Sequence, residues 1–458
     1  MKTILKKIVT NIHKMQPTQI MVLGFAIIII IGALLLSLPI ATQSGESVGF
    51  LDAIFTATSA VCVTGLIVVD TSTYWSMFGQ VVIIGLIQIG GLGFMTATTL
   101  FALLIKKKIN LRERLLLQES LNQGDLSGLV KLTRYVIIMT FTVEGIGALL
   151  LSTVFIPQFG IRKGIWYSIF HAISAFCNAG FDLMGSVSGP FSSLTSYVNN
   201  FTLTMTISML IILGGIGFPV MLDIIKMKKF SKFNLHSKIV LTTTALLILI
   251  GTVFIFLVEF NNPSTLGTLG IGGKLLASFF QSVTSRTAGF NTIDLSAMHQ
   301  ASLFIMIILM FIGASPASTG GGIKTTTLAT LIITVRSFVY NKNDIEVFER
   351  RIEYSTLRKS LGIFVLGITV VVIGTLIISL SETHFSLVEV GFEVVSAIAT
   401  VGLSIGGTPS MSIIGKIFIM IFMFMGRVGS LTILMAISSK GTKKKQTIRY
   451  PEGKIIVG

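Results

Sequence analysis

Four short segments of the sequence share a residue spacing that suits them to coordinate a cation. Each has a phenylalanine, a small or β-branched residue four positions later, and a glycine six positions after that. The segments are Phe55-Ser59-Gly65, Phe170-Ser174-Gly180, Phe279-Val283-Gly289 and Phe392-Ser396-Gly402. Glycine adopts a positive φ readily, which lets successive carbonyl oxygens turn toward one axis. Rings of carbonyls that replace an ion's hydration shell form potassium selectivity filters, so the spacing predicts such a filter.

The glycines and the two residues before each are the predicted source of these carbonyl oxygens. They are Val63, Thr64, Gly65, Asn178, Ala179, Gly180, Thr287, Ala288, Gly289, Thr400, Val401 and Gly402. A single glycine of this kind would more commonly allow close helix packing, but four at one offset from an aromatic favour a filter. We expect a short helix to end before each glycine, so that the negative end of its dipole faces the cation, and an extended strand to follow.

Composition identifies the chain as an integral membrane protein with helical spans. It has 458 residues, of which 52% are hydrophobic and only 12% charged, and its mean hydropathy is +0.87. Soluble domains average about 25% charged residues, and a transmembrane barrel would show short alternating segments instead of unbroken apolar runs. The glycine segments recur every 109 to 115 residues, far beyond the period of solenoid repeats, roughly 20–50 residues.

The basic residues predict the topology. Of 35 Lys and Arg residues, 28 fall in five clusters, at 2–14, 106–134, 226–238, 336–359 and 440–454. Such periodic placement is typical of cytoplasmic segments, so we expect these clusters and both termini in the cytoplasm. It argues against a nucleic-acid partner, although the net charge is +16.

Eight apolar segments between these clusters have the length of a membrane span, which needs about 20 residues. They are 18–41, 78–105, 133–156, 200–225, 239–260, 300–335, 358–380 and 413–438. The first is too long for a signal peptide, and we expect it to be retained. Eight crossings place every glycine segment on the outer side, where each enters the membrane and returns. Irregular backbone at that depth is tolerated only if it is buried in protein or lines water.

The predicted fold is therefore all-α, with eight transmembrane helices in four outer helix–pore loop–inner helix repeats around a central pore. The expected organisation is a cytoplasmic N-terminus at 1–17, repeat 1 at 18–105, repeat 2 with its preceding cytoplasmic loop at 106–225, repeat 3 with a broken inner helix at 226–335, repeat 4 at 336–438, and a cytoplasmic tail at 439–458.

The sixth span is interrupted by a run of helix-breaking residues. These are Ala314, Ser315, Pro316, Ala317, Ser318, Thr319, Gly320, Gly321 and Gly322, followed by Lys324. Proline costs about 3 kcal/mol inside a helix and glycine about 1 kcal/mol, so the helix should unwind. The freed backbone groups need water or one another, which places this loop against the pore below the filter. The alternative is a kinked helix end packed away from ions.

The chain resembles the membrane subunit of the Ktr potassium-uptake systems, in the Trk/Ktr/HKT superfamily, over nearly its whole length. The segments that carry the resemblance are 85–94, 171–176, 287–291, 312–327, 424–427 and 449–453. It implies a homodimer in a bacterial cell membrane that takes up K⁺, stimulated by Na⁺, with no cofactor bound in this chain. It further implies regulation by a separate cytosolic ring of nucleotide-binding regulator-of-conductance subunits. The filter segments depart from the threonine-valine-glycine-tyrosine-glycine pattern of potassium channels, which leaves the sharpness of K⁺ over Na⁺ selectivity open.

The resemblance also implies that the loop in the sixth span gates the pore and that Arg427 projects into the pore near this gate. A buried ion pair between Arg427 and Glu144 is the alternative, since charges inside a membrane are usually functional or paired. We expect Arg286 to brace the third pore helix. Lys324 either competes with potassium for the acceptors of the loop or marks the cytoplasmic mouth.

The remaining polar residues suggest no catalytic site. Glu259, Glu389 and Asp52 are expected to be solvated charges near the outer face, and Cys62 and Cys177 to be buried free thiols. His171 is expected to be a hydrogen-bonded core residue. No metal spacing or catalytic triad stands out, so the chain is not expected to be an enzyme. The alternative function is a secondary transporter of another substrate, with a site at a broken helix.

Overall fold

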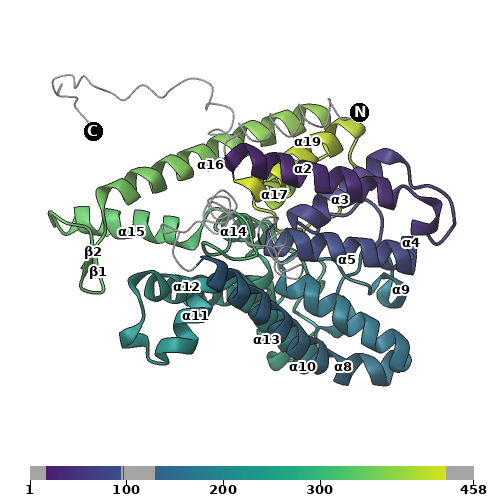
Figure 1. Ribbon diagram of the computed structural model, residues 1–458, viewed down its shortest axis with the longest axis horizontal. Coiled ribbons are helices and arrows are strands. Elements are labelled where there is room, and N and C mark those ends of the chain that lie inside the picture. The colour runs from purple at the N-terminus through teal and green to yellow at the C-terminus, as the bar shows by residue number, and fades with distance from the viewer. Residues whose placement is uncertain (1–16, 94–95, 97–128, 430–458) are drawn as a thin grey trace.

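The computed structural model describes residues 17–93, 96 and 129–429, and within them the chain is almost entirely helical (Figure 1). The main helices are α2 (Pro17–Leu36), α3 (Phe50–Cys62), α5 (Met77–Leu92), α8 (Leu129–Phe176), α10 (Phe201–Ile216), α11 (Phe218–Met227), α12 (Leu235–Glu259), α13 (Ile271–Thr284), α14 (Gln300–Phe311), α15 (Thr325–Val339), α16 (Tyr354–Ser381), α17 (Leu387–Ile398) and α19 (Ile413–Val428). Shorter helices are α4 (Thr71–Tyr74), α9 (Gly185–Ser188) and α18 (Gly407–Ser410), with 3-10 turns η1 (Pro39–Ala41), η2 (Thr195–Tyr197) and η3 (Phe230–Lys232). A hairpin pairs β1 (Glu346–Val347) with β2 (Arg350–Arg351).

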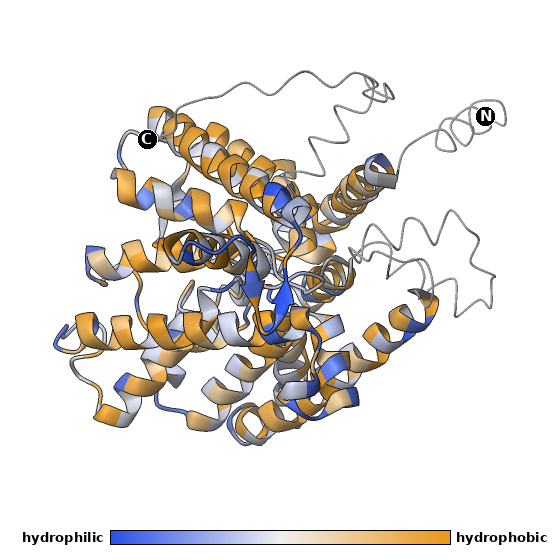
Figure 2. Cartoon of the chain, turned by 90° about the vertical axis from the view of Figure 1, so that its left-hand side faces the viewer, coloured by the Kyte–Doolittle hydropathy of each residue, from blue (hydrophilic) through white to orange (hydrophobic). Residues whose placement is uncertain are grey.

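Four of the described helices, α2, α8, α12 and α16, are long and apolar enough to cross a membrane, and the bent pair α10–α11 would be a fifth. Their outward surfaces carry exposed apolar side chains such as Leu149, Leu257 and Leu380, which are 71%, 68% and 83% exposed. Figure 2 shows apolar residues along the outward helices, whereas the β1–β2 hairpin is hydrophilic. Apolar surface of this extent is expected where a helix faces lipid, because lipid tails are as apolar as these side chains.

Each glycine segment begins with a short buried helix, as expected. These helices are α3, the final part of α8, α13 and α17. In the second segment α8 is broken at Gly160, which has φ 76° and ψ 170°. The chain changes direction there, and the residues after Gly160 form a separate helix. The helix predicted at 133–156 and the short helix that follows it are therefore two helices separated by a kink at Gly160.

The helix contacts run in a closed circle. After each glycine segment comes a helix that packs against the short helix of the next segment: α5 against α8, α10 against α13, α14 against α17, and α19 against α3. The last contact joins the C-terminal segment to the N-terminal one. A circle of this kind brings residues from all four segments to one central region.

Two interruptions divide the helices below this region. The loop 312–324 separates α14 from α15, so the break predicted in the sixth span is confirmed. A second break was not predicted, because 200–225 was expected to be one continuous span. There α10 and α11 are bent by 98° at Gly217. This glycine has φ 93°, and a β-carbon built on it would lie 2.5 Å from the carbonyl oxygen of Pro316.

The bend at Gly217 yields a stability prediction. Gly217→Ala should lower the melting midpoint in detergent, because a left-handed residue with a side chain costs about 1–2 kcal/mol and the added carbon meets the loop backbone. Gly145→Ala is the matched control, since nothing lies within 4 Å of a β-carbon at Gly145. Equal melting midpoints for the two variants would contradict this account of the bend.

Candidate ion-binding site

The four predicted filter glycines come together in one ring. A β-carbon built on Gly180 would lie 2.8 Å from the carbonyl oxygen of Ala288, and one on Gly289 would lie 2.8 Å from that of Val401. The other two contacts are of the same kind and tighter, from Gly65 to the carbonyl of Ala179 and from Gly402 to the carbonyl of Thr64. Each segment thus abuts the next, and the fourth returns to the first.

The backbone of the ring repeats one unusual conformation. All four glycines have a positive φ, between 72° and 93°. The residue two positions before each glycine is left-handed as well: Val63 at 56°, Asn178 at 60°, Thr287 at 72° and Thr400 at 51°. The prediction of a uniformly extended strand is therefore wrong at its first residue. Such conformations cost of order 1–3 kcal/mol each and persist only where the surroundings enforce them, typically at functional sites.

The short helix of each glycine segment carries a hydroxyl with a structural role that the sequence pattern alone did not reveal. In all four segments a hydroxyl of the short helix bonds to backbone at or just after the glycine. Ser59 and Ser396 Oγ each accept from the glycine N–H at 3.1 Å, Ser174 Oγ donates to Phe181 O at 2.7 Å, and Thr284 Oγ1 donates to Phe290 O at 2.6 Å. In the third segment Thr284 takes over the role that Val283 cannot perform.

The residue after the phenylalanine holds the outer loop in two segments. His171 Nε2 accepts from the N–H of Leu183 at 3.3 Å, and Glu393 Oε1 accepts from the N–H of Ile405 at 3.1 Å. Both bonds span twelve residues and end three positions beyond the glycine. His171 is therefore a hydrogen-bonded core residue, as predicted. Glu393 was missed, although its equivalent position was visible in the repeat.

The loop 312–324 lies directly beneath the ring. A β-carbon on Gly320 would meet the hydroxyl of Thr287 and lie 3.2 Å from Asn178 Nδ2, and one on Gly321 would meet the hydroxyl of Thr400. The loop therefore packs against ring residues of the second, third and fourth segments. The loop residues predicted to form the gate all lie here, between the ring and the start of α15.

The loop is held by backbone groups of the α10 end and by its own lysine. Ser315 N donates to Gly215 O at 2.9 Å and Thr319 N to Gly214 O at 3.2 Å. Lys324 Nζ donates to the carbonyl oxygens of Gly320 at 2.7 Å and Gly321 at 3.4 Å. Its ammonium group therefore occupies acceptors of the loop.

Arg427 joins this loop to α5. Its guanidinium donates to the carbonyl oxygen of Thr319 in the loop and to those of Gly90 and Gly91 at the end of α5, the last at 3.3 Å. Glu144, the alternative partner, instead accepts from Gln88 Nε2 at 3.1 Å. Among the described residues, backbone carbonyls and not a carboxylate therefore accept from the arginine.

The other charged residues have separate local roles. The prediction that Glu259 is a solvated charge is wrong. Its side chain is fully buried and accepts hydrogen bonds from Asn262 Nδ2 at 2.7 Å and Thr265 Oγ1 at 2.8 Å. Asp52 pairs with Lys416 at 3.1 Å. Cys62 and Cys177 are buried free thiols, as expected.

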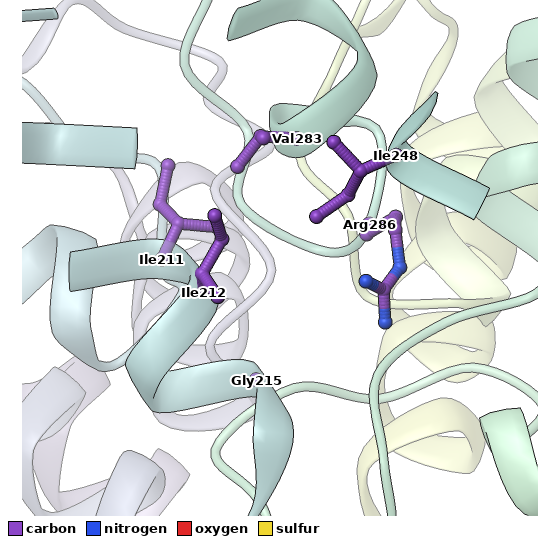
Figure 3. Close-up of a pocket in the computed structure, with 6 residues that line it drawn as sticks. All are labelled: Ile211, Ile212, Gly215, Ile248, Val283 and Arg286. Atoms are coloured by element: carbon purple, nitrogen blue, oxygen red, sulfur yellow. The ribbon is translucent and has the colours of Figure 1, made fainter. Parts of the chain in front are cut away.

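Arg286 lies behind the third short helix, beside a cavity of about 10 Å³ (Figure 3). In the figure Arg286 lies on the same side of the pocket as Ile248 of α12, across from Ile211 and Ile212 of α10. The side chain is buried, and its Nη2 donates to Thr244 Oγ1 at 3.5 Å. This bond links the base of α13 to α12, which fits the predicted bracing.

Comparison with known proteins gives the family of the chain. Residues 5–445 match the family model TrkH, described as "Cation transport protein". The chain belongs to the TrkH family of cation transport proteins, in its Ktr branch. It is 43% identical to Ktr system potassium uptake protein B of Bacillus subtilis over 445 residues, 97% of each chain. It is 44% identical to potassium/sodium uptake protein NtpJ of Enterococcus hirae over 459 residues, the whole of both.

A solved structure agrees with this assignment at the level of the fold. The potassium transporter TrkH from Vibrio parahaemolyticus superposes with a TM-score of 0.68 at 16% identity, covering 91% of this chain and 85% of that one. Members of the TrkH family are cation transporters, so the chain is a multi-pass membrane protein and not an enzyme.

The hydroxyl bonds of the ring can be tested one at a time. Ser396→Ala should lower the melting midpoint, because it leaves the buried N–H of Gly402 without an acceptor, a loss of about 1–3 kcal/mol. Ser410→Ala is the control, since Ser410 is exposed and bonds only to carbonyls of its own turn. If Ser396→Ala is no more destabilising than Ser410→Ala, the hydroxyl does not support the ring.

Proposed function

We propose that this protein moves K⁺ across the bacterial cell membrane through the ring formed by Gly65, Gly180, Gly289, Gly402 and the residues before them. The observation that carries the proposal is the closed ring itself, in which each glycine abuts a carbonyl of the next segment. Convergent carbonyl oxygens replace the hydration shell of a potassium ion. The Ktr and NtpJ relatives, named as potassium and potassium/sodium uptake proteins, support K⁺ as the cation and Na⁺ as a stimulating ion.

In this proposal eight transmembrane helices form four repeats around the pore. The outer helices are α2, the first part of α8, α12 and α16; the inner helices are α5, α10–α11, α14–α15 and α19. The cyclic helix contacts support this arrangement. Figure 1 has α4 and α9 at one end of the molecule and the β1–β2 hairpin at the other. This fits an outer mouth at the end of the molecule that carries α4 and α9.

The loop 312–324 is proposed to be the gate. Its position directly below the ring supports this role, since Gly320 and Gly321 fill the space beneath Thr287 and Thr400. Arg427 would hold the loop closed through its bonds to Thr319 and the end of α5. A positive charge at this point would also repel a cation that leaves the ring.

Regulation is proposed to come from outside the chain. The cytoplasmic segments between the predicted spans are too short for a nucleotide-binding domain of about 100–150 residues. We propose a homodimer that sits on a cytosolic ring of nucleotide-binding regulator-of-conductance subunits. The basic segments 106–114 and 226–238 and the tail from residue 440 are candidate docking surfaces; 106–114 and the tail lie outside the described residues. Co-purification of the ring with a chain truncated after residue 440 tests this, and undiminished binding would argue against the tail.

The ring glycines make the first functional prediction. Serine at any of the four should raise Na⁺ permeability relative to K⁺ or abolish uptake, because a side chain disfavours the required φ and enters the carbonyl of the next segment. Uptake of ⁸⁶Rb⁺ and ²²Na⁺ into a strain lacking its own K⁺ uptake measures this ratio. Gly145→Ser is the control, because nothing lies within 4 Å of a β-carbon at Gly145 and its φ is not positive. Unchanged affinity and selectivity in all four ring variants would refute the assignment.

The gate makes the second functional prediction. Deletion of residues 315–321 should raise K⁺ flux in proteoliposomes without changing K⁺ over Na⁺ selectivity, since the ring above is intact. Arg427→Ala should act in the same direction more weakly, because it removes the clamp but leaves the loop. A folded Arg427→Ala protein with flux at or below the wild-type level would contradict the role of the arginine.

A further inference from the structure

A large apolar groove between α12 and α15 lies apart from the ring and its gate. Its volume is about 800 Å³, within the range of about 300–1,000 Å³ that small-molecule pockets occupy. Side chains at helical spacing line it from both sides, among them Thr243, Leu246 and Ile250 on α12 and Leu328 and Ile332 on α15. Leu246, Ile250 and Ile332 are each more than half exposed, at 52%, 54% and 56%, so the groove opens to the surroundings.

One end of the groove is apolar and closed, and the other is polar. At the closed end, Leu247 packs with Leu309 and Ile312, and Leu328 completes this small cluster. At the other end the lining consists of the last turn of α15 and the β1–β2 hairpin, including Arg336. An occupant must therefore have a long apolar part and a polar end.

The polar end carries charges of both signs. Arg336, Lys342, Glu346 and Glu349 all line it. Lys342 Nζ and Glu346 Oε2 form an ion pair at 3.7 Å. Arg336 and Glu349 are therefore left without an ion pair among the described residues of the lining. Lys238 lies nearby, with its ammonium 5.9 Å from the ring of Phe348.

The groove lies at the membrane boundary in the proposed topology. The N-terminus of α12 lies in the basic cluster 226–238 and the C-terminus of α15 in the cluster 336–359, both of which are predicted to be cytoplasmic, and the apolar walls belong to membrane helices. The molecule with an apolar tail and a polar end at this boundary is a phospholipid of the inner leaflet. The two remaining charges, one of each sign, favour a zwitterionic headgroup whose amine can donate hydrogen bonds, since Arg336 matches a phosphate and Glu349 an ammonium.

We propose that this groove binds a phospholipid with a primary-amine headgroup, with one acyl chain between α12 and α15, its phosphate at Arg336 and its amine at Glu349. The site goes beyond the proposed transport function, but one of its two walls, α15, is directly connected to the proposed gate. Directly before α15 is the loop 312–324, and Thr325 Oγ1 at the first residue of α15 bonds to Ser315 Oγ at 2.9 Å. A lipid that fixes the distance between α12 and α15 therefore also restrains the loop.

Native mass spectrometry of the full chain in detergent tests the site, with phosphatidylethanolamine, phosphatidylglycerol and phosphatidylcholine of identical acyl chains added in turn. We expect phosphatidylethanolamine to bind most tightly. Arg336→Gln should weaken binding of all three lipids by about fivefold, the typical contribution of one basic residue to a lipid surface. Glu349→Gln should weaken phosphatidylethanolamine alone. Arg358→Gln, an exposed arginine outside the groove, should change nothing.

A substitution that fills the groove with a larger side chain tests whether the lipid binds there. Ile332→Trp should abolish the tight binding, whereas Val335→Trp, on the same helix but outside the lining and 63% exposed, should preserve it. Preserved binding in Ile332→Trp would overturn the site. Equal binding of the three lipids, or tighter binding of phosphatidylglycerol that Glu349→Gln does not affect, would overturn the assignment of the headgroup.

Loss of the dimer in Ile332→Trp with unchanged lipid binding would assign the groove to a second copy of the chain. Uptake of ⁸⁶Rb⁺ is measured separately, so failure of the lipid site and failure of the transport proposal are distinguishable.

Discussion

The structure depends on four places where backbone must approach backbone without an intervening side chain. At each of the four ring glycines a β-carbon would lie less than 3.0 Å from a carbonyl oxygen of the next segment, which is impossible without displacement of the main chain. Only glycine combines this approach with a positive φ at no steric cost. The short helices, their hydroxyls and the cyclic packing of the inner helices all serve to bring these four points together.

The strain in the ring requires an environment that enforces it. The left-handed residues include Val63, Thr287 and Thr400, whose β-branched side chains make such a φ a genuine outlier. They are fully buried, and the hydroxyls of the short helices bond to the ring glycines or to the residues after them. A rigid, preorganised ring avoids the cost of ordering carbonyls when an ion enters, which is the general advantage of preorganisation.

The gate region, unlike the rigid ring, is held by interactions that can be released. Arg427 and Lys324 are held by neutral carbonyl oxygens, and Glu144 is occupied elsewhere. Hydrogen bonds from a charged donor contribute about 1.5–3 kcal/mol each, which a regulator can offset through a modest difference in affinity between two states. A buried ion pair would be harder to open, because separation would leave an uncompensated charge. The geometry therefore combines a fixed ring with a releasable loop.

Much of this arrangement was predictable from spacing, and the misses have physical causes. The membrane class followed from composition. The recurrent glycines and the proline and glycines of 312–324 are local backbone signals, so the short helices and the broken α14–α15 pair followed from them. The bend at Gly217 had a local signal too, since Pro219 two residues later suits the start of a helix, but the surrounding apolar run hid it. The burial of Glu259 was not predictable, because its partners Asn262 and Thr265 come from a loop whose path depends on tertiary packing.

The central claim is that the four glycine segments hold a cation among their carbonyl oxygens. Crystals grown in Tl⁺ or Rb⁺ salts test it directly through anomalous scattering. The account predicts a peak on the axis of the ring, within coordinating distance of the carbonyl oxygens of Thr64, Ala179, Ala288 and Val401, which is lost in Gly180→Ser. A well-ordered ring with no peak on this axis, or with peaks only elsewhere in the molecule, would contradict it.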